Sequence, residues 1–234
     1  MPAEIAHDAP HPSRRRGLAR RTLVVLYRRL LGARWGVRSA RVYAGFLAIS
    51  TAATIWVLAR KVGADETTLS LVARSAALLT WIAGGIATLT LAAPPKDPAF
   101  ALGIAALASA RGHDAETISQ AEWVATVRLV AEVVVIPIAA IGLLVVAFFA
   151  GGRSGAVLPV LGAVAFGAIA SIVLGGAAAG CRRWGREQGR SWLVTIVLLP
   201  WVLAEVVMEE RAAAYLSIPG ILGRIWEVLT SGAS

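Results

Sequence analysis

The chain has 234 residues, of which 57% are hydrophobic and only 16% are charged, and its formal net charge is +9. Soluble domains are about 45–50% apolar, so this composition excludes an ordinary water-soluble globular protein and favours a chain that is surrounded by lipid. The positive charge does not indicate a nucleic-acid partner, because the arginines are concentrated at the ends of apolar segments, where they orient helices in an anionic membrane.

The cysteine and histidine content sets further limits. Cys181 is the single cysteine and cannot form an intrachain disulfide. His7, His11 and His113 are scattered along the chain and do not make a metal-ligand cluster. The sequence therefore predicts neither a structural metal nor a disulfide framework.

The N-terminal region carries most of the orientation signal. We expect the polar, basic segment 1–21 to be a disordered cytoplasmic tail. Ten arginines lie between Arg14 and Arg41, and the positive-inside rule therefore places the N-terminus in the cytoplasm. Over 22–38 leucines recur at helical spacing opposite arginines, which is typical of a helix lying in the membrane interface. This helix is either a basic anchor or an elbow that enters the membrane sideways.

Five apolar runs are near the length of about 20 residues that a helix needs to cross a bilayer. They cover residues 42–59, 69–93, 124–150, 156–180 and 191–208. The sequence therefore predicts an all-α, polytopic membrane bundle, with 22–234 as one transmembrane domain. The basic loop 181–190 agrees with a cytoplasmic N-terminus, whereas the two positive charges in the loop 60–67 do not.

A further apolar segment lies near the C-terminus, over 217–230. Arg224 and Glu227 interrupt it, and a charge at mid-bilayer costs about 2.5–3.5 kcal/mol. We therefore predict five full spans followed by an amphipathic or re-entrant helix. A short sixth span packed against partner helices is the alternative.

The segment 94–122 is the most structured of the predicted loops. Two prolines end the second span, and Asp97 can cap a new helix over 98–110. Gly112 can end that helix in the left-handed conformation, and Asp114 can cap the next one. The sequence predicts a rigid helix–turn–helix on the cytoplasmic face, although a simple connecting loop is the alternative.

This segment resembles the coupling-helix region of ABC exporter permeases of the second type, the class that includes the haem-exporter B subunit and many drug and polysaccharide exporters. The residues that carry the resemblance are Phe100-Ala101-Leu102-Gly103-Ile104-Ala105-Ala106-Leu107, then Ala110-Arg111-Gly112, and then Ile118, Ala121 and Val124. A second similarity is the basic turn from Arg183 that leads into a fifth span bearing Pro200. The chain differs from many members in having no glutamate at 102 or 103 and no clear sixth span.

The resemblance implies how the subunit works. In that family an elbow precedes the first span, and the helix between the second and third spans fits a cleft on a cytoplasmic ATPase. The residues that would contact the ATPase are Phe100, Leu102, Ile104, Leu107 and Arg111. The implied protein is a permease subunit of a bacterial inner-membrane exporter that pairs with a second permease copy or homologue. ATP and Mg would be held by the ATPase, and no cofactor is expected in this chain.

Motifs for chemistry are incomplete. The Gly-x-x-x-x-Gly spacing of 175–180 lacks the following Lys and Ser or Thr of a phosphate loop, so Gly176 and Gly180 are better explained as small residues at a helix contact. The Gly-x-Ser-Gly pattern at 152–155 matches rhomboid-type proteases, but no histidine follows His113 to act as the base. We predict no catalytic residue and no enzyme activity. A non-transporting scaffold or anchor subunit is the main alternative function.

Three of the charged residues within the predicted spans are candidates for a functional role, and Arg74 near the outer start of the second span can turn its charge to the surface. Arg128 and Glu132 are four residues apart on one helix and can pair, either as a structural pair or as part of a proton relay. Glu205 lies one turn from the outer end of the fifth span, where it can meet Arg211 or Arg153. An acidic residue inside a membrane is a candidate for function by default.

Overall fold

The computed structural model describes residues 12–62, 66–95, 98–149 and 157–207, together with Ile221, Leu222, Ile225 and Val228. Every regular element in this part of the chain is helical. The all-α prediction is therefore confirmed for the described residues.

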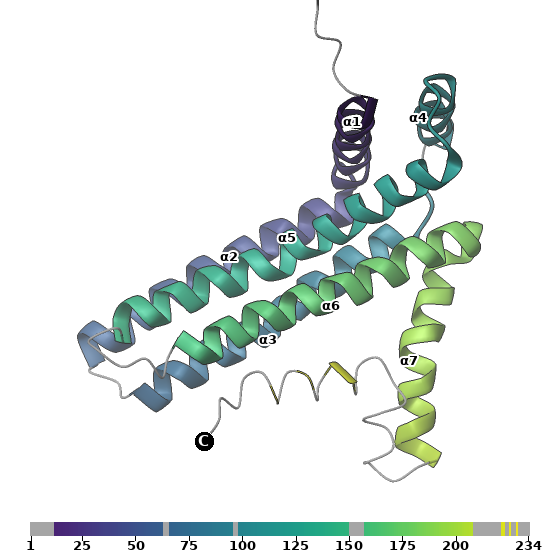
Figure 1. Ribbon diagram of the computed structural model, residues 1–234. Coiled ribbons are helices and arrows are strands. Elements are labelled where there is room, and N and C mark those ends of the chain that lie inside the picture. The colour runs from purple at the N-terminus through teal and green to yellow at the C-terminus, as the bar shows by residue number, and fades with distance from the viewer. Residues whose placement is uncertain are drawn as a thin grey trace, which may run out of the picture.

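Four long helices run side by side and form a bundle (Figure 1). They are α2 (Trp35–Val57), α3 (Glu66–Ala92), α5 (Ala115–Phe149) and α6 (Val157–Trp184). In the apolar segment of α5, 44% of the residues are buried, against 17% in that of α2. The helix α5 therefore lies nearer the centre of the bundle and α2 at its edge. The helix α5 contacts α1, α2, α3 and α6, whereas Ile136 and Leu143 lie on its exposed side.

The main core lies between α3, α5 and α6. Its buried members from these helices include Leu91, Leu129, Val130, Val134, Ile138 and Phe166, and Leu31 of the N-terminal helix packs with them. Close approach of α5 and α6 depends on Gly175, because a Cβ there would lie 2.8 Å from Cα of Val127. The sequence pointed to Gly176 and Gly180 for this contact. Gly180 instead faces Trp184 of its own helix, so that assignment was wrong for Gly180.

Among the described residues, three helices are long and apolar enough to cross a membrane: Trp35–Arg60, Ala115–Leu144 and Val160–Trp184. This finding is consistent with a membrane-embedded protein. The other two predicted spans also coincide with helices, α3 and α7 (Gly189–Val207). Within α3 the described apolar stretch is the shorter Leu79–Ala92, and five spans stay a prediction.

The N-terminal helix differs from the expected boundaries. It is α1, Pro12–Gly32, and α2 begins at Trp35. Residues 12–21 are therefore helical rather than disordered, whereas 1–11 lie outside the described residues. The break falls at Ala33 and Arg34 because Arg34 adopts an extended backbone and turns its side chain toward the end of α3.

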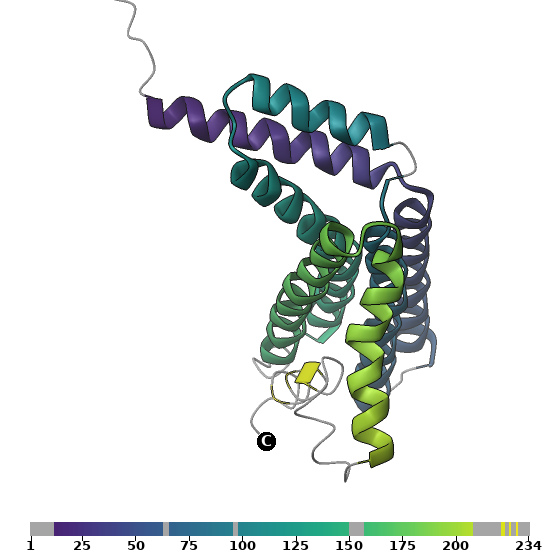
Figure 2. The same cartoon turned by 90° about the vertical axis from the view of Figure 1, so that its right-hand side faces the viewer.

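The helices α1 and α4 (Pro98–Ala110) lie side by side across one end of the bundle (Figure 2). We call this end the α1–α4 end. A second core joins these two helices to the start of α5. Its buried members are Leu23, Val24, Tyr27, Ile104, Ala108, Ala121 and Ala125. The leucine face of α1 is therefore covered largely by protein, since α1 packs on α4 and α5.

The chain leaves α6 through a short 3-10 turn, η3 (Arg186–Gln188), and enters α7, which diverges from the bundle (Figure 1). Leu193 of α7 and Leu222 both pack into the main core, with Ile225 against it. Most of the segment 217–230 lies outside the described residues, so the choice between an amphipathic helix and a sixth span stays open.

Candidate functional site

The first candidate site is the outward face of α4. The bounds of this helix match the predicted 98–110, and Gly112 ends it with a φ of 78°, in the left-handed region that glycine favours. Asp114 caps the next helix, since the Thr117 amide donates to Asp114 Oδ1 at 2.9 Å. Hydrogen bonds from Thr117, first from its side chain and then from its backbone amide, lower the pKa of the Asp114 carboxyl below its ordinary value. The predicted helix–turn–helix is confirmed over 98–122.

The residues assigned to ATPase contact do not share one face of α4. The side chains of Leu102 and Leu107 are 68% and 64% exposed, and Arg111 is exposed beyond the end of the helix. Ile104 is only 7% exposed and packs in the core with α1 and α5. Ile104 therefore anchors the helix and cannot contact a partner directly. Phe100 lies in α4, but its side chain is outside the described part of the chain.

Tyr27 connects α1 to the polar groups at this end of the bundle. It is buried in the core beneath α4. Burial, followed by the nearby Glu122 carboxylate, raises the pKa of the Tyr27 phenol, while the charge of Arg182 opposes this shift. An acidic and a basic side chain of the bundle therefore lie close enough to Tyr27 to act on its charge.

These two side chains form a buried network that the sequence analysis missed. The guanidinium of Arg182 donates to Glu122 Oε1 at 2.8 Å, to the Leu91 carbonyl at 2.5 Å and to Thr126 Oγ1 at 2.9 Å. Arg182 is 7% exposed and lies in the last turns of α6, not in the solvated loop that we expected over 181–190. A buried charge is tolerated when it is paired and hydrogen-bonded, as it is here. The sequence pattern that could have indicated this network is Glu122 and Thr126, two polar residues four positions apart on one face of α5.

The carboxyl end of α3 receives a second arginine. Arg34 donates to the carbonyls of Ala93 and Pro94, at 2.8 and 3.0 Å. Burial, then repulsion from Arg182 and Arg190, lowers the Arg34 pKa to about 10, so the side chain is charged at neutral pH. Cations at a helix carboxyl end are favourable because they satisfy its unpaired carbonyls and complement its dipole. Arg34 and Arg182 thus hold the segment that leads into α4.

Glu132 is the acidic residue of the second polar cluster. The sequence led us to expect a pair with Arg128. In the structure Arg28 Nε lies 2.7 Å from Glu132 Oε1, and Arg41 Nη2 lies 2.8 Å from Glu132 Oε2. Among the described residues Arg128 is exposed and makes no ion pair with Glu132. Glu132 therefore joins α1, α2 and α5, because folding brings two basic side chains to its free oxygens.

The structure does not describe the side chains of the remaining predicted site residues, so their assignments stay predictions. Glu205 lies in α7 with its side chain outside the described part, and Arg211 and Arg153 lie wholly outside it. Residues 152–155 are likewise not described. Comparison with known proteins adds no assignment, since no family model, curated protein or solved structure matches this chain.

Proposed function

We propose that this chain is a permease subunit of an ATP-driven exporter in a bacterial inner membrane, with its α1–α4 end in the cytoplasm. The observation that carries the proposal is the exposed apolar surface of α4. Leu102 and Leu107 are exposed on two sides of this helix, which Ile104 and Ala108 anchor to α1 and α5. Exposed apolar side chains on an anchored helix suit a protein partner.

The connections of α4 support a mechanical role. The residues before it are held by Arg34 at the end of α3, and Arg182 ties the same end to α5 and α6. After α4 the chain turns at Gly112 and enters the long, central helix α5. A force on α4 would therefore reach three helices of the bundle. In this proposal ATP and Mg are bound by a cytoplasmic ATPase. This chain changes its conformation and catalyses no reaction itself.

Further parts of the proposal follow from the same assignment. The exposed arginines of the α1–α4 end, including Arg20, Arg21 and Arg29, support a cytoplasmic location by the positive-inside rule. The subunit would work beside a second permease copy or homologue, since the family that it resembles works in pairs. A scaffold subunit would use the same face of α4 without an ATPase.

The test is retention of an ATPase by the tagged chain purified from its native membrane. We expect the wild-type protein to carry a stoichiometric ATPase whose sequence contains a phosphate loop. Leu107→Asp should abolish this retention and reduce the co-purified ATP hydrolysis at least tenfold, because a charge replaces an exposed apolar contact. The matched control is Val25→Asp, which places the same charge at an exposed apolar position of α1.

The proposal fails if the wild-type protein retains no such ATPase, or if Leu107→Asp and Val25→Asp retain it equally. A different stoichiometric partner that is lost only in Leu107→Asp would establish the scaffold function instead. Circular dichroism of each variant in detergent verifies that the helices are intact.

A further inference from the structure

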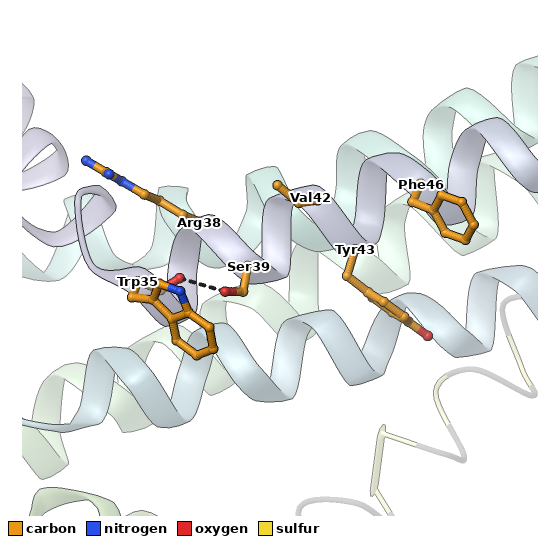
Figure 3. Close-up of a pocket in the computed structure, with 6 residues that line it drawn as sticks. All are labelled: Trp35, Arg38, Ser39, Val42, Tyr43 and Phe46. Atoms are coloured by element: carbon orange, nitrogen blue, oxygen red, sulfur yellow. Dashed lines mark hydrogen bonds between the residues drawn. The ribbon is translucent and has the colours of Figure 1, made fainter.

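The outward face of α2 carries a groove near its first residue. Trp35, Arg38, Ser39, Val42, Tyr43 and Phe46 line it. Figure 3 shows Trp35 and Tyr43 on one side of the helix and Arg38 and Val42 on the other, with the short side chain of Ser39 between them. Phe46 lies at the end away from Trp35. The groove therefore runs along the helix and opens to the surroundings of the bundle.

Its two ends differ in chemistry. At the α1–α4 end lie Arg38 and Trp35, whose indole is 83% exposed. Farther along, Val42 and Phe46 are both exposed and apolar. Tryptophan is enriched at the level of lipid headgroups, and an arginine at a helix end turns its charge toward the interface. In Figure 3 Arg38 points back toward the start of α2, in keeping with this arrangement.

Arg38 differs from the neighbouring arginines of this region because its side chain is not used in a hydrogen bond or ion pair within the described part of the chain. Arg34 is occupied by the Ala93 and Pro94 carbonyls, and Arg41 is occupied by Glu132. Glu132 in turn is neutralised by Arg28 as well. Among the described residues Arg38 makes no ion pair, and its guanidinium is exposed beside a groove. The local charge at the head of the groove is therefore positive and fits an anion.

The apolar part of the groove fits within one half of a bilayer. The groove spans roughly 16 Å from Trp35 to Phe46 at 1.5 Å per residue, and its part beyond Arg38 spans about 12 Å. The hydrocarbon core of a bilayer is about 30 Å thick, so one leaflet accounts for about 15 Å of it. A molecule with an anionic head at Arg38 and an acyl chain along Val42 and Phe46 would occupy a single leaflet.

We propose that this groove binds one anionic phospholipid of the leaflet at the α1–α4 end. Arg38 donates to the phosphate, Trp35 lies at the headgroup level, and one acyl chain lies along Val42 and Phe46. The Ser39 hydroxyl donates to the Trp35 carbonyl at 3.0 Å and is therefore not available as a donor to the phosphate. The site depends on the membrane environment of the bundle and not on an ATPase, so it can stand if the transport proposal fails.

Lipid binding to the full-length protein is measured by native mass spectrometry in detergent, with phosphatidylglycerol and phosphatidylcholine of identical acyl chains. We expect one saturable site that prefers phosphatidylglycerol by about fivefold, the effect of one basic side chain near an anionic headgroup. Arg38→Gln should remove this preference. The control Arg29→Gln removes an equal, exposed charge from α1 and should leave the preference unchanged.

A second pair of variants tests the groove itself. Val42→Trp fills the groove and should weaken the saturable phosphatidylglycerol site at least fivefold. Ala53→Trp adds the same side chain to the exposed face of α2 beyond the groove and should have no effect. Both residues are exposed, so neither change overpacks the core.

Four outcomes would overturn the proposal. The two lipids could bind equally, Arg38→Gln and Arg29→Gln could lower binding equally, or the two tryptophan variants could behave alike. In the fourth outcome Val42→Trp converts a dimer to a monomer in the same mass spectra while lipid binding is unchanged, which would assign the groove to a second copy of the chain.

Discussion

At the scale of single residues, Arg182 was expected in a basic loop but is buried and holds several helices together. Three of its nitrogens bind groups from α3 and α5, and its charge is removed from solvent. Its sequence neighbour Arg183 is exposed and reaches Ser119 from the outside. Two adjacent arginines therefore have different roles, because successive helix positions point about 100° apart.

This difference predicts unequal effects of two matched substitutions. Arg182→Met should lower the free energy of unfolding by about 3 kcal/mol, because the Leu91 carbonyl and the Glu122 carboxylate lose their buried partner. Arg183→Met should cost less than about 1 kcal/mol, since an exposed polar contact contributes little. Chemical unfolding in micelles, followed by circular dichroism, measures both.

A double variant separates the contribution of the Arg182–Glu122 ion pair to stability from that of side-chain packing. If the Arg182–Glu122 pair carries the cost, adding Glu122→Gln to Arg182→Met should recover part of the lost stability. Equal destabilisation by the two methionine variants would contradict the assignment of Arg182 as the buried partner.

At the scale of elements, helix ends were predictable and helix faces were only partly so. The bounds of α4 follow from Pro98, the left-handed Gly112 and the Asp114 cap, all of which act within a few residues of the chain. The face that α4 buries was not predictable in the same way. Ile104 was assigned to a partner, whereas α1 and α5 cover it. The residues of α4 are apolar on every side of the helix, so the sequence does not specify which side packs on the rest of the protein.

The Asp114 cap at the start of α5 predicts a pH dependence. Its pKa is lower in the folded chain than its ordinary value of 3.8, so the cap contributes stability above pH 3.8 and loses it as the pH falls through the folded pKa. The Thr117 amide resonance should therefore titrate with a midpoint below 3.8. Asp114→Asn keeps an acceptor without a charge and should show no such titration.

The measurement is an NMR pH series on the labelled protein in micelles. A midpoint for Thr117 at or above 3.8, or the same titration in Asp114→Asn, would show that Asp114 is not the group that caps α5.

At the scale of the whole molecule, two of the three apolar clusters among the described residues stabilise different parts of the structure. The main core holds the bundle, and the second core fastens α1 and α4 across one end of it. The helix α5 belongs to both cores. At about 1.5 Å per residue its 35 residues extend well beyond a hydrocarbon core of about 30 Å. Its first turns therefore lie outside the lipid together with α4, if the bundle spans the membrane.

This geometry, together with the proposed cytoplasmic location of the α1–α4 end, predicts a pattern of accessibility in the membrane. Gln120→Cys, in the exposed first turns of α5, should react with a membrane-impermeant maleimide in inside-out vesicles and not in intact cells. Leu143 is also exposed in the structure, but Leu143→Cys should react in neither, because lipid would surround it. The native Cys181 is buried and supplies the low background.

The opposite sidedness for Gln120→Cys would place the α1–α4 end outside the cell and would contradict the proposed ATPase contact. Labelling of Leu143→Cys as rapid as that of Gln120→Cys would contradict burial of α5 in lipid.

The sequence by itself determined the helical class, the positions of the long helices and the turn between α4 and α5. These features depend on apolar run length, prolines, glycines and caps, which act locally. Only the tertiary structure decided which residues meet. It paired Glu132 with Arg28 and Arg41 instead of Arg128, buried Arg182 against Glu122, and left Arg38 beside an open groove. Such pairings join residues far apart in the chain, and their partners are selected by how the helices pack, which local spacing does not encode.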